Sequence, residues 1–459
     1  MKRRLASIAT SVWLIVIVAM GLRLAYGWSQ LRQSPANSFT AQFWQETGSI
    51  AHSLAVGKGY SSPYGAESGP TAWLTPVYPV LIAGIFRIFG VESLHSFFAS
   101  VFMNMIFSAA TCIPIFYAAK RITASKGVAA GAAWAWALFP NAIILPFEWI
   151  WDTSLITLLV ATLLWATLRL AESQRWRDWC AYGLLWGFAL MVNPAPAVLL
   201  PFWLAWLAYQ SYQSSRATHS SLAHGQISQR PARQHPARQW FARPALSAAI
   251  AILCCVPWTV RNYLVFHEFV PLRSNLGMEL YVGNNENYDD VHPRVYPYLI
   301  TKDRELYRFS KMGEMPFVHE EMRKAVNFIV GHPRVEVRLT AERAVSFWMG
   351  TPTPLRDFHR ADTFLLQMVS VCNLLAVLGT LGGIAVLYHR RSEFTFPLAI
   401  SPVVFPLLYY ATHATLRYRH PLDPIIVILA TIAAAAPLPA LANRRQPAPP
   451  RAPGATLCG

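Results

Sequence analysis

The chain has 459 residues, of which 54% are hydrophobic and only 14% charged, and its mean hydropathy is +0.31. That composition leaves too little polar material to cover a soluble globule of this length, so it excludes a soluble protein and predicts an integral membrane protein. The net charge is +16, but the basic residues are not interspersed with aromatic residues and form no nucleic-acid-binding motif, so we also exclude a nucleic-acid partner. We assign the positive charge to orientation in the bilayer and to contact with anionic membrane lipids.

Ten apolar runs are candidates for crossing a membrane, which takes roughly 20 residues. The first, residues 5–27, follows three basic residues and has no convincing cleavage site after it, so we interpret it as an uncleaved signal anchor. The others cover residues 97–119, 127–146, 153–170, 179–193, 195–210, 244–265, 362–388, 395–413 and 422–441. The sequence therefore predicts an all-α polytopic membrane protein with about ten transmembrane helices. Residues 75–90 are shorter and begin with two prolines, which favours an interfacial or re-entrant helix.

Lysines and arginines concentrate on alternate loops, and the positive-inside rule then places both termini in the cytoplasm. The resulting organisation is an N-terminal membrane module (1–265), an extracytoplasmic region (266–361), C-terminal transmembrane helices (362–441) and a disordered cytoplasmic tail (442–459). The module contains a first outer loop at 28–96 and a polar cytoplasmic loop at 213–243. The extracytoplasmic region ends in two amphipathic stretches, 316–330 and 333–348, which we expect to be helices that cap the membrane part.

The first outer loop carries a carboxylate, Glu46, on an expected helix over residues 40–55. An apolar stripe on that helix includes Phe43 and Ile50, and Glu46 lies at its edge. Desolvation at this boundary would raise the pKa of Glu46 and make it a usable base; the alternative is an ordinary solvated glutamate. The outer loops contain no cysteine, and no His or Cys spacing indicates a metal site.

Three further stretches carry candidate site residues. Asp152 lies in the short outer loop PFEWIWDTSL together with Glu148, although Asp before Thr-Ser is also typical of a helix N-cap. Arg417 and Arg419, in ATLRYRHPLDP, precede a proline, so we expect an extended segment whose two guanidinium groups point one way. Two such groups would bind the phosphate of a substrate. The alternative is that both side chains reach to the phosphates of membrane lipids. Asn284 belongs to a Gly-Asn-Asn turn that could offer donors to a sugar or phosphate.

The order of these features resembles a known superfamily. An N-terminal span is followed by the acidic outer loop, then by GPTAWLTPVYPVLIAGIFRIFG, and a string of helices closes in RYRHPLDP. This arrangement is similar to the GT-C superfamily of membrane glycosyltransferases, with bacterial protein O-mannosyltransferases and the lipid A aminoarabinose transferase as the nearest relatives. The resemblance covers the chain from Lys2 to about Leu441. It implies a bacterial inner membrane location and an active site on the extracytoplasmic face.

The resemblance also implies roles for particular residues. Glu46 occupies the place of an essential acid in the first outer loop, but Gln45 stands where the family often has a second, adjacent acid. Asp152 matches another family acid. The lysine that meets the lipid phosphate in the aminoarabinose transferase is absent from WLTP, so that role falls to Arg417, Arg419 or Lys58. Tyr78, in PVYP, and Asn284 and Glu148 are further candidates for binding the substrate.

The function expected on these grounds is inverting transfer of a sugar from a polyprenyl-phosphate donor to an acceptor, which is a protein, lipid A or another glycan. Glu46 or Asp152 would act as base and the arginines would neutralise the phosphate. No cofactor is assigned, and a divalent cation stays an open possibility. One alternative is a transporter or flippase of lipid-linked sugars, but the sequence shows no obvious internal repeat of the kind that transporters have. Another alternative is an enzyme like the O-antigen ligases or polymerases.

Overall fold

The computed structural model describes residues 9–33, 39–223, 239–286, 303–350 and 364–436, and the regular secondary structure in these ranges is entirely helical. The predicted all-α class is therefore confirmed for the described part of the chain. The predicted tail at 442–459 lies outside these ranges, and the predicted cytoplasmic loop 213–243 is described only at its two ends, where α12 reaches Ala223 and α13 begins at Gln239.

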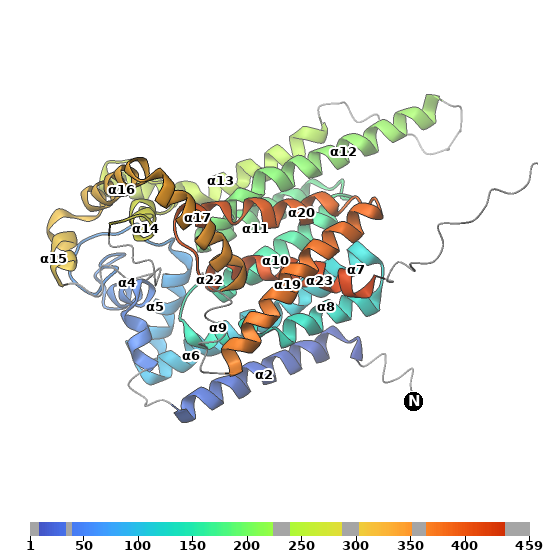
Figure 1. Ribbon diagram of the computed structural model, residues 1–459. Coiled ribbons are helices and arrows are strands. Elements are labelled where there is room, and N and C mark those ends of the chain that lie inside the picture. The colour runs from blue at the N-terminus through green and yellow to red at the C-terminus, as the bar shows by residue number, and fades with distance from the viewer. Residues whose placement is uncertain (1–8, 34–38, 224–238, 287–302, 351–363, 437–459) are drawn as a thin grey trace, which may run out of the picture.

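Long helices form the body of the molecule and lie roughly side by side (Figure 1). They coincide with the apolar runs of the sequence. Their bounds are α2 Val12–Gln33, α6 Leu94–Ala110, α7 Cys112–Thr123, α8 Lys126–Leu138, α9 Pro140–Glu148, α10 Thr153–Leu170, α11 Trp176–Val192, α12 Leu200–Ala223, α13 Gln239–Phe266, α19 Phe364–His389, α20 Thr395–Val404, α21 Leu407–Ala411 and α23 Asp423–Ala435.

The count of about ten transmembrane helices is not confirmed. In the described residues, five helices are long and apolar enough to cross a membrane, or six if α8 and α9, which meet at a bend of 42°, form one span. Within the described residues, the remaining predicted spans are largely helical, but two of them are interrupted: α11 ends before Asn193-Pro194, and Pro406 separates α20 from α21. Proline lacks the N–H that would continue a helix, so these runs yield shorter segments.

Small residues allow the long helices to approach closely. A Cβ atom on Gly383 of α19 would lie 2.2 Å from the carbonyl oxygen of Leu429 in α23, and one on Gly187 of α11 would lie 2.4 Å from Cβ of Cys254 in α13. Where the surroundings are apolar, close packing of this kind replaces the hydrophobic effect as the force that holds helices together.

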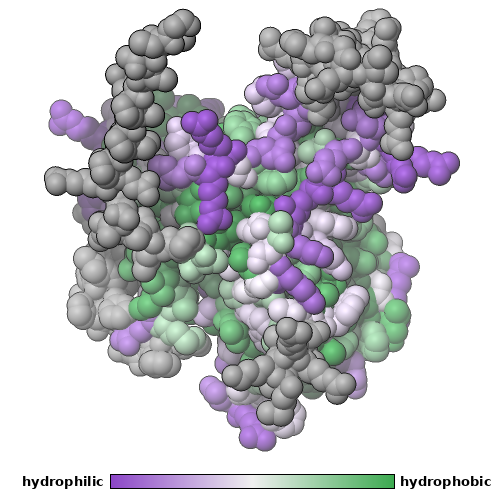
Figure 2. Space-filling model, turned by 90° about the vertical axis from the view of Figure 1, so that its right-hand side faces the viewer, coloured by the Kyte–Doolittle hydropathy of each residue, from purple (hydrophilic) through white to green (hydrophobic). Residues whose placement is uncertain are grey.

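Shorter helices gather at one end of the long ones, at the left of Figure 1. They are η1 Ala41–Trp44, α4 Glu46–Ala55, α5 Val77–Phe89, α14 Leu276–Gly283, α15 Asp303–Met312, α16 Glu314–Gly331 and α17 Pro333–Met349. The two amphipathic stretches expected to cap the membrane part are thus confirmed as helices, α16 and α17. The opposite end of the molecule carries hydrophilic side chains around an apolar body (Figure 2).

Candidate active site

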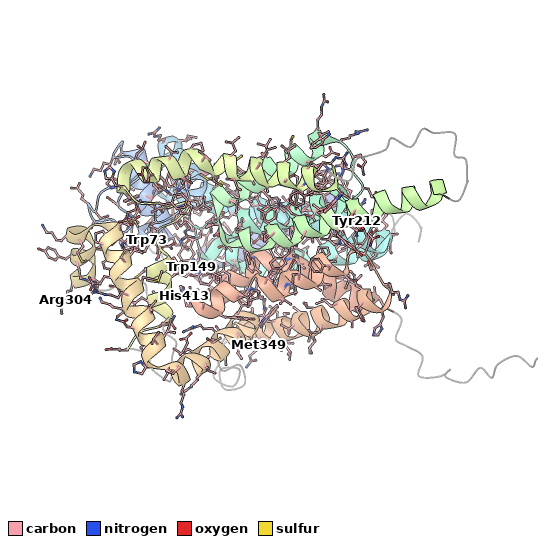
Figure 3. All side chains as sticks on the ribbon, turned by 90° about the horizontal axis from the view of Figure 1, so that it is seen from above. Trp73, Trp149, Tyr212, Arg304, Met349 and His413 are labelled. Carbon is pink, nitrogen blue, oxygen red and sulfur yellow. The ribbon has the colours of Figure 1, made fainter. Side chains whose placement is uncertain are left out.

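A cavity of about 990 Å³ lies where the short helices meet the long ones. Segments far apart in the chain form its wall: the start of α4, the loop and turn before α5, the junction of α9 and α10, the turn after α11, the segment leading into α14, and the stretch around α22 (Leu416–Arg419). Trp73, Trp149 and His413, which all line the cavity, lie near one another in Figure 3. The cavity is therefore assembled only by the tertiary fold.

Glu46 lines this cavity as the first residue of α4. The expected apolar stripe is buried, since Phe43, Ile50 and Ala51 are inaccessible to solvent. Burial raises the pKa of the Glu46 carboxyl, and the nearby charge of Glu279 adds to the rise, while the cavity arginines oppose it. A carboxyl with a raised pKa holds a proton more readily, and the role of Glu46 as a base stays a prediction.

Asp152 lines the same cavity. It occupies the N-cap position of α10, yet its side chain accepts no capping hydrogen bond from the helix. Instead, its carboxylate accepts a hydrogen bond from Nδ2 of Asn193, at 2.9 Å, across the cavity wall. Burial raises the pKa of Asp152, against the lowering effects of Arg273, Asn193 and Arg417. Asp152 is therefore the N-cap residue of α10 by position, as its sequence pattern indicated, but its side chain does not cap the helix and lines the cavity instead.

Arg417 contributes a cation to the cavity. Its guanidinium lies over the ring of Trp151 and donates to the hydroxyl of Tyr418 at 3.0 Å. The Nη1 atom is buried and has no hydrogen-bond partner in the structure. A buried cationic donor without a partner is costly, so this atom is suited to bind an anionic group that enters the cavity.

Arg419 does not line the cavity, which corrects the expectation that the two arginines converge. It is fully buried, pairs with Asp423 at 2.8 Å and donates to Oδ1 of Asn373 at 2.7 Å and to the carbonyl of Trp348. The reason is local: α22 is a helical turn rather than an extended segment. Residues two apart on a helix point to nearly opposite sides, so Arg417 and Arg419 diverge.

The other sequence-predicted residues divide between the cavity and its surroundings. Tyr78 lines the cavity, and its hydroxyl donates to Asn104 at 2.8 Å. Lys58 is exposed and pairs with Glu67 at 2.7 Å, and Glu148 accepts a hydrogen bond from Tyr26 at 2.7 Å. Neither of these two belongs to the cavity wall.

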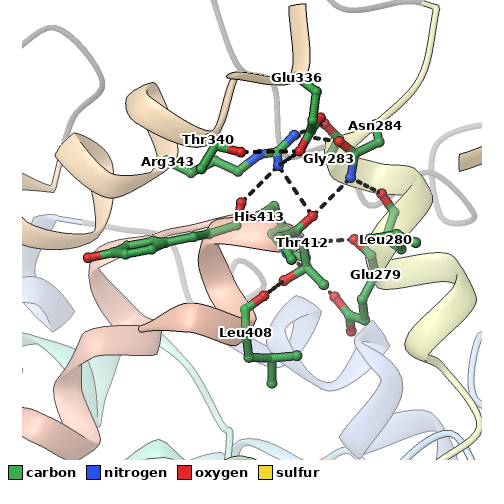
Figure 4. Close-up of polar contacts among 12 residues, drawn as sticks. Glu279, Leu280, Gly283, Asn284, Glu336, Thr340, Arg343, Leu408, Thr412 and His413 are labelled. Carbon is green, nitrogen blue, oxygen red and sulfur yellow. Dashed lines mark hydrogen bonds and ion pairs between the residues drawn. The ribbon is translucent and has the colours of Figure 1, made fainter. Parts of the chain in front are cut away.

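Asn284 is buried behind the cavity in a structural cluster, shown in Figure 4. Its side chain donates to the carbonyl oxygens of Leu280 and Ala411 and accepts from Arg343 at 2.7 Å. Arg343 also donates to the carbonyl of Gly283, at 2.6 Å. The polar atoms of Asn284 are thus used to tie α14 to α17 and α21, and the side chain does not line the cavity wall.

Sequence reasoning missed two charged residues of the cavity. Arg273 lines the wall and donates through Nε to the carbonyl of Trp73 at 3.0 Å. It lies in the expected extracytoplasmic region 266–361, which is too long for the positive-inside rule to mark a single arginine. Glu279 of α14 accepts a hydrogen bond from Asn275 at 2.6 Å, and no sequence signal marked it.

The part of the chain that the structure describes contains no group of side chains arranged to bind a metal ion. There, no three His, Cys, Asp or Glu side chains converge so that they could hold an ion. The cavity instead combines two arginines with three carboxylates, Glu46, Asp152 and Glu279. Cations and bases side by side in a partly desolvated site suit the transfer of a group that leaves as an anion.

Part of the chain is similar to a known protein family. Residues 71–227 match the model of the family described as dolichyl-phosphate-mannose-protein mannosyltransferase. No curated protein matches the chain in sequence.

Among solved structures, the chain resembles the oligosaccharyltransferase of Archaeoglobus fulgidus. The apo form has a TM-score of 0.50 and 13% identity over 93% of this chain and 50% of that one. The complex with zinc and sulfate has a TM-score of 0.48 and 14% identity over 91% of this chain and 48% of that one. The complex of AglB from the same organism with an inhibitory peptide and a dolichol-phosphate has a TM-score of 0.49 and 13% identity over 93% of this chain and 50% of that one. The chain spans about half the length of these proteins. The family match over residues 71–227 confirms the predicted resemblance to GT-C glycosyltransferases for that part of the chain, and the match to the apo form shows a similar fold.

Proposed function

We propose that the protein is an integral-membrane glycosyltransferase that moves a sugar from a polyprenyl-phosphate donor to an acceptor at the extracytoplasmic face of a bacterial inner membrane. The observation that carries the proposal is one cavity that holds Glu46 and Asp152 together with Arg273 and Arg417. The family match supports a lipid-phosphate donor, since that family is described by its dolichyl-phosphate-mannose substrate.

Arg273 and Arg417 are the proposed phosphate ligands. Both face the cavity, and Arg417 has an unused buried donor, Nη1. Arg273 thus takes the place of Arg419, the second arginine expected from the sequence. The wall is otherwise largely apolar and includes Leu145, Ile156 and Leu408, which suits an isoprenoid chain that enters from the lipid. Two fixed cations would stabilise the phosphate more in its leaving state than in the bound donor, since negative charge grows on it as the sugar departs.

The proposed reaction breaks the bond between the anomeric carbon and the phosphate oxygen. The acceptor oxygen or nitrogen forms its bond to that carbon from the opposite face, which inverts the anomeric configuration. Its proton passes to Glu46 or Asp152, whose raised pKa values bring the proton affinity of a carboxylate closer to that of the acceptor. The electron pair of the broken bond leaves with the polyprenyl phosphate, which stays anchored by its lipid.

A transporter is less well supported. The charged residues of the cavity lie near the end of the long helices that carries α4 and α14, whereas transporters place such groups near the middle of the membrane. A reaction at one surface of the membrane requires only that the charged residues gather at one end of the long helices.

The test is Glu46→Gln in membranes supplied with a radiolabelled polyprenyl-phosphate sugar. We expect transfer to fall by about 10² or more, because a neutral amide cannot take the proton. Glu67→Gln is the matched control, since Glu67 lies in the same loop but is 85% exposed and outside the cavity. Transfer by Glu46→Gln at the rate of the control would remove Glu46 from the mechanism. Loss of transfer in Arg273→Gln and Arg417→Gln would support the phosphate site separately.

A further inference from the structure

A chain of hydrogen bonds lies behind the cavity arginine Arg417. Its Nη2 atom donates to the hydroxyl oxygen of Tyr418 at 3.0 Å. That oxygen is 2.9 Å from Nε2 of His413, and the other ring nitrogen, Nδ1, is 3.3 Å from the backbone carbonyl oxygen of Glu279. All four residues line the cavity, so the chain connects α14 to the segment that carries Arg417.

One assignment of hydrogens on a neutral imidazole satisfies the three hydrogen bonds of this chain, and it leaves Nε2 of His413, which lies 3.5 Å from Oε2 of Glu279, without a proton. A carbonyl oxygen only accepts, so Nδ1 of His413 carries the ring proton. A guanidinium only donates, so the Tyr418 oxygen accepts from Arg417. The Tyr418 proton is then free to be donated to Nε2. This arrangement needs a neutral imidazole, and burial lowers the pKa of His413, helped by Arg417 and Arg343 and opposed by Glu279.

The guanidinium of Arg417 is held on two sides. Trp151 covers one face, and Tyr418 fixes Nη2. Nη1 is left buried and without a partner. An arginine side chain has much rotamer freedom, so a site that binds an anion with a single arginine edge gains affinity when that edge is fixed in advance.

We propose that His413 and Tyr418 are positioning residues for the donor phosphate: His413 directs the Tyr418 hydroxyl so that its oxygen holds Arg417 with Nη1 presented to the phosphate. The inference rests on the proposed function, which assigns Arg417 to that group. His413 itself touches no phosphate in this scheme and acts only through Tyr418.

Two amide substitutions of His413 separate its two nitrogens. Glutamine can place its amide oxygen near the position of Nε2 and still accept from Tyr418, whereas asparagine is too short and reaches only the Nδ1 position. Tyr418→Phe removes the acceptor for Arg417 altogether. Tyr410→Phe is the matched control, because Tyr410 also accepts a hydrogen bond through its hydroxyl, from Trp348 at 2.7 Å, but does not line the cavity.

The readout is calorimetric titration of the purified full-length protein with geranyl phosphate, a short polyprenyl phosphate that needs no acceptor and no turnover. We expect His413→Asn and Tyr418→Phe to weaken binding about tenfold, as for loss of a hydrogen bond to a charged group. His413→Gln and Tyr410→Phe are expected to bind as the wild type does. In transfer assays the same variants should lower kcat/KM for the donor, and kcat should fall as well, because Arg417 stabilises the leaving phosphate more than the bound donor.

Three outcomes overturn the inference. His413→Asn and Tyr418→Phe that bind like the wild type, while Arg417→Gln does not bind, refute the relay and leave the proposed function intact. Equal weakening by His413→Gln and His413→Asn shows that Nε2 is not the atom that matters. Unchanged binding by Arg417→Gln removes both the relay and the phosphate role of Arg417. Melting temperatures of all variants, measured in the same detergent, show whether each is folded.

Discussion

Gly48 offers a direct test of how strictly Glu46 must be held. Gly48 follows Glu46 by two residues on α4, and a Cβ atom at this position would lie only 2.0 Å from the carbonyl oxygen of Phe43. Real Cβ contacts essentially never fall under 3.0 Å, so in Gly48→Ala the Phe43 turn and α4 must separate by about 1 Å. Glu46 lies between the two points that move apart, so its carboxylate moves with them.

A displacement of about 1 Å in a catalytic group costs roughly 10² in rate, so we expect Gly48→Ala to lower turnover of a labelled polyprenyl-phosphate sugar by that factor. The overpacking should also cost about 1–3 kcal/mol of stability, visible as a lower melting temperature in detergent. Gly84→Ala is the matched control, because Gly84 is also helical and a Cβ there would meet nothing within 4 Å. Gly48→Ala with the turnover of Gly84→Ala would refute the argument that the position of Glu46 limits the reaction.

Other substitutions test separate parts of the site. Glu279→Gln removes a negative charge that raises the pKa of Glu46, so the acid limb of the pH profile of kcat/KM should shift to lower pH; a shift upward would contradict the coupling. Arg419→Ala leaves the buried Asp423 carboxylate without its arginine and with only His420 as a side-chain partner, so it should cost about 3–5 kcal/mol in thermal or denaturant unfolding, whereas an unchanged stability would speak against the buried pair. Lys58→Ala breaks only an exposed ion pair, so turnover and donor KM should stay at wild-type values; a raised KM would return Lys58 to the phosphate site.

The sequence predicts less about the positions of the arginines than about the position of Glu46. Glu46 was found because the apolar pattern of residues 40–55, which depends on near neighbours, predicts a helix with Glu46 at the edge of its stripe, although the structure divides this stretch into η1 and α4 at Gln45. Arg417 was found for its place on an outer loop, but the partner assigned to it, Arg419, faces away because the segment is a helical turn. Arg273 replaces it from a segment well over 100 residues earlier in the chain. A choice between helix and extended chain over four residues depends on packing, which local pattern does not specify.

Composition and the order of apolar runs by themselves determined that this is an all-α membrane protein, because burial in lipid is a property of each segment alone. The convergence of α4, α10, α14 and α22 on one cavity and the hydrogen bonds of Asp152 and His413 were decided only by the tertiary structure. Those features depend on contacts between residues distant in the chain. Such contacts form only when the helices have packed, so no single stretch of the sequence encodes them.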